Sequence, residues 1–110
     1  MPVEKWSEKI SIVHLGTDPQ FTDDLVGLES ALARGMTDVI LDFTGVQFLN
    51  SSNLSRLLRL RKSLVEGGRR LVLCGLSTKV WGAFIVTGLD KVFEFSEAVP
   101  TALATLQLER

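Results

Sequence analysis

Apolar and polar residues alternate along the chain with two different periods. Residues 39–43 form an apolar run broken only by Asp42, which indicates a buried strand. Residues 54–64 place leucines three or four positions apart, a spacing that keeps one face of a helix apolar. The strand and helix within residues 39–64 are therefore the best-defined part of the pattern.

The same two periods predict the other elements. In chain order we expect a strand at 9–16, a helix from about 22 to 34, a strand at 71–76, a helix at 78–86, a short strand at 91–95 and a last helix from 96 to about 106. Thr22 is expected to cap the first of these helices and Gly35 to end it in a left-handed conformation. A weak pattern at residues 6–8 leaves open a further strand in front.

Strands that alternate with helices predict an α/β fold with right-handed crossovers. We expect a single domain over residues 1–110, with a largely parallel, mixed sheet of four or five strands and about four helices. Ser11, Asp42 and Glu94 interrupt strands that would otherwise be apolar, so the sheet is expected to be covered fully on one side only.

Composition narrows the function classes. Apolar residues make up 45% of the 110 residues and charged residues 23%, which is typical of a globular domain. The net charge of −1 gives no nucleic-acid footprint, and the apolar runs are too short to span a membrane. The N-terminus lacks an apolar signal segment, and a single cysteine, Cys74, fits a reducing compartment. These features predict a cytoplasmic protein.

The sequence contains few candidate catalytic residues. His14 is the single histidine and lies in a predicted strand, where a structural or partly exposed role is expected. With one histidine and one cysteine, a zinc site lacks ligands, and Cys74 is expected to be inert core. No glycine-rich phosphate loop is present. The sequence therefore predicts a protein that is not an enzyme and binds no metal or cofactor.

The turn at residues 49–53 carries four small polar residues where the central helix begins. One interpretation is a cap, because asparagine and serine side chains accept bonds from the first free N–H groups of a helix. The other is a seat for a phosphate, which the same N–H groups and the helix dipole favour.

Residues 41–46 and 48–54 resemble the signature of the STAS domain, the fold of anti-sigma factor antagonists. In that family an Asp-Leu-Ser-Gly-like run is followed by Phe-Met-Asp-Ser-Ser-Gly-Leu at the start of a helix. Residues 75–80 and 86–93 are similar to the second half of the domain, so the resemblance covers roughly residues 9–107.

The resemblance implies a phosphorylated serine at Ser52, the second of the pair, with Ser51 as the second candidate. Asn50 and Asn53 stand where the family usually has aspartate and glycine, and Asp18 loosely matches an aspartate of the family's first turn. The residues expected to contact a partner are Asp18, Asn50, Ser51, Asn53, Arg56 and Arg59. The implied partners are a bacterial anti-sigma factor that is also a serine kinase, and a serine phosphatase that resets the switch.

Two questions stay open at the level of sequence. Arg56 and Arg59 are explained either as solvated helix flanks or as part of a partner surface, and Trp81 either as core or as an interface anchor. A second function is a non-switching STAS-like subunit of a larger assembly, such as a lipid-transport ATPase complex or a stress-signalling scaffold. Asn50 and Asn53, which depart from the family pattern, favour this second function.

Overall fold

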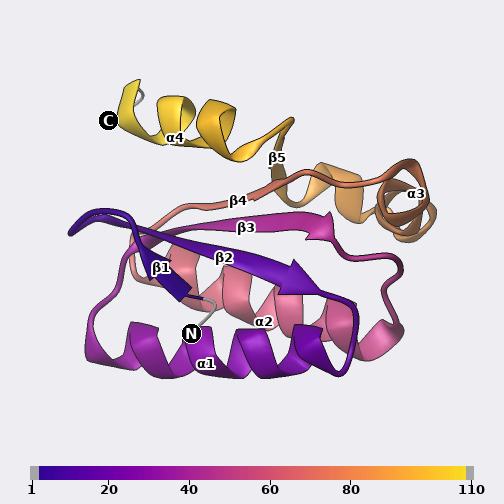
Figure 1. The fold of residues 1–110 in the computed structure, drawn as a ribbon, viewed down its shortest axis with the longest axis horizontal. Helices are drawn as coiled ribbons and strands as arrows, with labels where there is room; N and C mark the ends of the chain where they lie inside the picture. The colour runs from indigo at the N-terminus through magenta and orange to yellow at the C-terminus, as the bar shows by residue number, and fades with distance from the viewer. Residues whose placement is uncertain (1–2, 109–110) are drawn as a thin grey trace.

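A computed structural model describes residues 3–108, in which helices cover both faces of one five-stranded sheet (Figure 1). The elements are β1 (Val3–Lys5), β2 (Ile10–Gly16), α1 (Gln20–Arg34), β3 (Asp38–Gly45), α2 (Ser51–Glu66), β4 (Leu71–Cys74), α3 (Thr78–Thr87), the 3-10 helix η1 (Leu89–Lys91), β5 (Glu94–Ser96) and α4 (Val99–Leu108). The strands lie in the order β1-β2-β3-β4-β5, and only β1 runs antiparallel to its neighbour. The expected α/β fold with a mixed, largely parallel sheet is confirmed. A strand in front is present as β1, but it lies at Val3–Lys5 and not at residues 6–8, where the sequence pattern placed it.

The two faces of the sheet have different coverings. In Figure 1 helices α1 and α2 lie beneath the sheet, α4 lies above it, and α3 lies beyond the end toward which β2 and β3 point. The larger core, between the sheet and α1, α2 and α3, includes Phe21, Phe43, Leu57 and Phe84, all fully buried. The smaller core lies under α4 and consists of Ile10, Ile12, Ile40, Val72, Cys74, Ala102 and Leu106. His14, further along the α4 face, is exposed.

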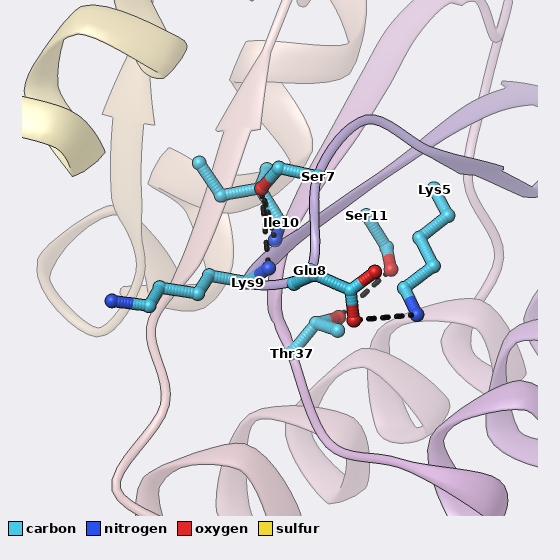
Figure 2. Close-up of polar contacts among 7 residues, drawn as sticks. All are labelled: Lys5, Ser7, Glu8, Lys9, Ile10, Ser11 and Thr37. Carbon is cyan, nitrogen blue, oxygen red and sulfur yellow. Dashed lines mark hydrogen bonds and ion pairs between the residues drawn. The ribbon is translucent and has the colours of Figure 1, made fainter.

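Short polar contacts stabilise the turn between β1 and β2 and the start of β2, as Figure 2 shows. The hydroxyl of Ser7 accepts hydrogen bonds from the backbone N–H groups of Lys9 and Ile10 at 3.1 and 3.2 Å, which fixes the turn between β1 and β2. The buried hydroxyls of Ser11 and Thr37 lie 2.8 Å apart. Ser11 therefore interrupts an apolar strand without leaving an unsatisfied polar group.

The start and end of α1 differ from the prediction. The helix begins at Gln20 after Pro19, and Thr22 is not its cap. Thr22 lies inside the first turn, where its N–H and hydroxyl both donate to Asp18. Gly35 ends the helix with φ 174°, which is extended backbone rather than the left-handed conformation we expected.

The last strand and the last helix have different boundaries from those predicted. Gly88, at φ 75°, ends α3 in the left-handed region, and the 3-10 helix η1 then includes Lys91, the first residue that we assigned to a strand. Strand β5 is therefore shorter and later than predicted, and α4 begins at Val99 instead of Ser96. Ser77 does cap α3, as expected, by accepting from the N–H of Val80.

Parallel strands bring the loops after β2 and β3 to the same edge of the sheet. Gly16 and Gly45 are paired at the end of these strands, and a Cβ atom on Gly45 would lie 2.8 Å from the carbonyl oxygen of Leu15. The two loops are also joined directly, because the N–H of Gln47 donates to the hydroxyl of Thr17 at 2.8 Å. The N-termini of α1 and α2 consequently lie beside each other.

Candidate functional site

Two asparagines, and not the serines, cap α2. The N–H of Asn53 donates to the side-chain oxygen of Asn50 at 2.8 Å, and the N–H of Asn50 donates to the side-chain oxygen of Asn53 at 3.0 Å. This reciprocal capping box satisfies the first free donors of the helix. Ser51 and Ser52 follow as the first two helical residues, and both are exposed. Within residues 3–108 neither serine hydroxyl has a hydrogen-bond partner, so both are available to another molecule.

Asp18 joins the cap of α2 to the first turn of α1. One carboxylate oxygen accepts from the side-chain amides of Asn50 and Asn53 at 3.2 and 2.8 Å. The other accepts from the N–H and the hydroxyl of Thr22 at 2.8 and 2.7 Å. We call Asp18, Asn50 and Asn53 the asparagine–aspartate latch, because these three side chains connect segments more than 30 residues apart in sequence.

The latch stabilises the charged form of Asp18. The hydrogen bond from Asn53, followed by those from Thr22 and Asn50, lowers the pKa of Asp18 from 3.8 to about 2 against a smaller opposing effect of burial. Four donors thus converge on one carboxylate. An aspartate at position 50, as the family pattern has it, would place a second carboxylate against Asp18 instead of a donor.

The serines border a hollow of about 370 Å³ between α1 and α2. We call it the serine hollow; its lining residues are Thr22, Ser51, Ser52, Ser55, Arg56 and Arg59. The guanidinium of Arg56 lies 3.2 Å from both carboxylate oxygens of Glu29 on α1. Arg59 is exposed and forms no ion pair among residues 3–108. The predicted partner-contacting residues therefore lie in the serine hollow or in the adjoining latch.

Sequence reasoning missed three residues of this region: Thr22 as a hydrogen-bond donor to Asp18, Glu29 as the partner of Arg56, and Ser55 in the serine hollow. A signal for Ser55 was present, since it lies four positions before Arg59 and shares its helix face. No sequence signal pointed to Glu29, because its contact with Arg56 depends on how α1 and α2 pack.

The apolar side chains of Phe48 and Trp81 differ in exposure. Phe48, in the loop before α2, is half exposed, and the ammonium of Lys79 lies 5.8 Å from its ring centre. Trp81 is partly buried and packs edge-on against Phe95, with the ring centres 4.8 Å apart. Packing with the core therefore accounts for Trp81, whereas Phe48 offers exposed apolar surface in the loop that leads to the serines.

A second polar cluster lies on the α4 face, at the ends of β2 and β3. His14 lies 2.7 Å from one carboxylate oxygen of Asp42, and Thr44 donates to the other through its N–H and hydroxyl. Burial raises the pKa of Asp42, but the hydrogen bonds from Thr44 and His14 outweigh it and leave the pKa lowered. Gly75, at φ 72°, packs so closely that a Cβ atom would lie 2.8 Å from Asp42. The cluster thus fixes the loop before α3 against the end of β3.

Other candidate groups have structural roles. Cys74 is fully buried, and burial together with the charge of Asp42 raises the pKa of its thiol to about 12, so it stays protonated. Among residues 3–108 no three His, Cys, Asp or Glu side chains lie close enough to hold a metal ion. In the same part of the chain, no helix combines the length and apolarity that crossing a bilayer requires.

The model of the STAS domain family matches residues 4–102, which is most of the chain. The chain belongs to the STAS domain family. The match includes every residue of the latch and of the serine hollow.

Solved structures of other proteins have the same fold. An anti-sigma-factor antagonist (STAS) domain protein from Planctomyces limnophilus matches with a TM-score of 0.82 and 19% identity, covering 96% of each chain. The anti-sigma factor antagonist SpoIIAA in its unphosphorylated form matches with a TM-score of 0.75 and 15% identity, also over 96% of each chain. A chain of the stressosome, described as a signal integration and transduction hub, matches with a TM-score of 0.76 and 18% identity over 99% of each chain.

Proposed function

We propose that this STAS domain is a regulatory binding module of the anti-sigma factor antagonist type, switched by phosphorylation of Ser52. The unmodified protein binds an anti-sigma factor that is also a serine kinase, in the cytoplasm of a bacterium. The kinase transfers the γ-phosphoryl group of ATP to the Ser52 oxygen, which loses its proton as ADP leaves. The modified protein dissociates, and a serine phosphatase hydrolyses the phosphate to restore the binding form.

This proposal is supported by the start of α2, where the residues that cap the helix differ from the serine that is proposed to be modified. Asn50 and Asn53 cap the helix, and the hydroxyl of Ser52 is exposed and has no hydrogen bond to any other residue that the structure describes. A phosphate there adds about −1.5 to −2 charges at neutral pH on a surface that a partner covers. A partner packed over the neutral turn would have to bury that charge, which is costly without a matching cation.

Catalysis by the protein itself is not part of the proposal. Asp18 and Asp42 are both held as hydrogen-bonded carboxylates, and Cys74 is held as a buried thiol. These groups support the fold around the serine, and the phosphoryl transfer is assigned to the partner. Asp18, Asn50, Ser51, Asn53, Arg56 and Arg59 are proposed as the residues that this partner meets.

The asparagine–aspartate latch favours a second function, a constitutive subunit of a larger assembly. Asn50 and Asn53 use their side chains to hold Asp18, which makes the turn a rigid surface. A rigid turn suits permanent docking, and a chain of the stressosome, a signal integration and transduction hub, has the same fold. In this function Ser52 is a contact residue that stays unmodified.

A pull-down from a lysate of the native cell separates the two functions. The baits are the wild-type protein, Ser52→Ala, Ser52→Asp and the matched control Ser51→Asp, with bound proteins identified by mass spectrometry. The switch predicts that a kinase-like protein binds the wild type and Ser52→Ala. The amount of this protein recovered on Ser52→Asp should be lower by about tenfold or more. Ser51→Asp adds the same charge one residue earlier and is expected to retain more of the partner.

Identical sets of bound proteins on all four baits would support the constitutive subunit and overturn the switch. Phosphopeptide mapping of the protein from native cells gives an independent readout. Modification at Ser51 or Thr44, and never at Ser52, would contradict the assignment of the acceptor.

A further inference from the structure

We propose that Arg56 and Arg59 form an intramolecular clamp for the phosphate on Ser52, so that modification removes both arginines from the partner surface. This inference rests on the proposed function, because it concerns the modified form of the same serine. It assigns to the two arginines a second role, which is to bind a phosphate of their own chain.

The spacing along α2 brings these three side chains together. Arg56 lies four positions after Ser52, and Arg59 lies three positions after Arg56, so all three project from one face of the helix. The structure confirms the common face, because all three line the serine hollow. At about 370 Å³, the hollow has room for a phosphate group and the guanidinium groups that would contact it.

Charge and geometry both fit a phosphate. A phosphoserine carries about −1.5 to −2 charges and three acceptor oxygens, and two guanidinium groups supply a matching +2 with several donors in a planar fork. The other lining residues of the hollow are a threonine and serines, and within residues 3–108 the acidic side chain that competes for Arg56 is Glu29, which lies outside this lining.

Glu29 is the group that holds Arg56 in the unmodified protein. The Arg56 guanidinium lies 3.2 Å from each Glu29 oxygen, and the pair is part-exposed, with 27% of the arginine side chain and 43% of the glutamate side chain accessible. Exposed pairs of this kind are weak. A dianion one helical turn away is therefore expected to take Arg56 from Glu29, leaving the glutamate unpaired on α1.

The clamp changes what a partner meets. Before modification, the surface offers a neutral serine and the cation of Arg59, with Arg56 paired to Glu29. After modification, both arginines face the phosphate, and Glu29 becomes an uncompensated negative charge on the neighbouring helix. A partner that uses acidic groups to bind this surface loses its cations and meets a new carboxylate. Withdrawal of the arginines thus adds to the direct repulsion by the phosphate.

The test uses protein with phosphoserine placed at position 52 during translation, so it needs no native kinase. Phosphorus NMR follows the second ionisation of the phosphate in the parent, Arg56→Gln, Arg59→Gln and Glu29→Gln proteins, with Arg61→Gln as the matched control. Arg61 is on the same helix but lines a different hollow, with Arg69 and Arg70. Circular dichroism of the unphosphorylated variants checks that each one folds.

A clamp stabilises the dianion, so removal of Arg56 or of Arg59 is expected to raise the phosphate pKa by about half a unit or more. Glu29→Gln frees Arg56 and is expected to lower the pKa, and Arg61→Gln is expected to leave it within about 0.2 units of the parent. The same pKa in the parent, Arg56→Gln and Arg59→Gln proteins would overturn the clamp. A shift with only one arginine variant would overturn the two-arginine form of it.

The two proposals can fail separately. A clamp seen by NMR in a protein whose Ser52 is never phosphorylated in cells would leave the geometry correct and the proposed switch wrong. Phosphorylation in cells without any pKa response to Arg56 or Arg59 would leave the switch correct and show that repulsion alone drives it.

Discussion

Helices α2 and α3 both begin in a serine-containing turn that follows a parallel strand, yet they use their serines in opposite ways. Ser77 caps α3 with its own hydroxyl, which accepts the N–H of Val80 at 3.2 Å. At α2 the same task belongs to Asn50 and Asn53. Ser51 and Ser52 lie inside the first turn, and their hydroxyls have no hydrogen-bond partner in the described part of the chain. The turn before α3 uses its serine to cap the helix, whereas the turn before α2 is capped by asparagines and leaves two serines exposed.

The difference shows how a modification site can be compatible with a stable helix. A phosphate on a capping serine would disturb the hydrogen bond that starts the helix. A phosphate on Ser52 leaves the hydrogen bonds of the cap in place, because the capping box and the latch use the asparagines and Asp18. The stability of the turn and its availability to a partner are thus assigned to different residues.

The largest loss of stability is expected from a substitution that removes the cap of α2. Asn53 is 2% exposed, caps through both its backbone and side chain, and donates to Asp18 at 2.8 Å. Asn53→Ala should lower the free energy of unfolding by about 2–3 kcal/mol, because it removes the cap contact and leaves buried polar groups without partners. Urea unfolding measures this loss, with Ser55→Ala one half-turn later as the control. A loss below about 0.5 kcal/mol, the range of ordinary surface changes, would show that the latch contributes little.

Acid should reveal the charge at the centre of the latch. The folded pKa of Asp18, about 2, is below its ordinary value of 3.8, so its contribution to stability is fully present above pH 3.8. That contribution is lost as the pH falls from 3.8 through about 2. Unfolding measured across this window should show a steeper loss of stability in the wild type than in Asp18→Asn. Parallel curves for the two proteins would mean that other carboxylates, such as Asp42, account for the acid response.

The smallest effects test the comparison directly. Ser77→Ala should cost about 1 kcal/mol, since a capping oxygen is removed. Ser51→Ala and Ser52→Ala should each change the free energy of unfolding by less than about 0.5 kcal/mol, because neither hydroxyl takes part in the cap. Thermal or urea unfolding of the three variants gives the ranking. If Ser52→Ala lowered the free energy of unfolding as much as Ser77→Ala, Ser52 would contribute to the cap of α2, which would contradict the comparison.

The periodic parts of the fold were predictable because burial repeats along the sequence. Leu57, Leu60 and Leu64 of α2 and the apolar run of β3 are buried as the pattern predicted, whereas Leu58 is exposed. Ser77 caps α3 as expected. The errors arose where one turn type replaced another. Thr22 resembles a cap by composition, but Asp18, four residues earlier, accepts both its N–H and its hydroxyl.

The site was predictable in its residues but not in its connections. The resemblance selected Ser52, Asn50 and Asn53, and their neighbours at helical spacing included Arg56 and Arg59. What the sequence could not show is that Asn50 and Asn53 both turn toward Asp18, a contact that spans more than 30 residues and depends on adjacent parallel strands. Two departures from the family pattern, which in the sequence resemble losses, are donors to one carboxylate in the structure.

The latch also constrains how this sequence can change over evolutionary time. Replacing Asn50 by aspartate alone would set two carboxylates against each other, and losing Asn53 alone would leave Asp18 short of its nearest amide donor, at 2.8 Å. Substitutions at the three positions are therefore energetically coupled, as expected for residues that share hydrogen bonds. Lineages of this protein should keep or exchange positions 18, 50 and 53 as a set, so that covariation among these positions would record the latch.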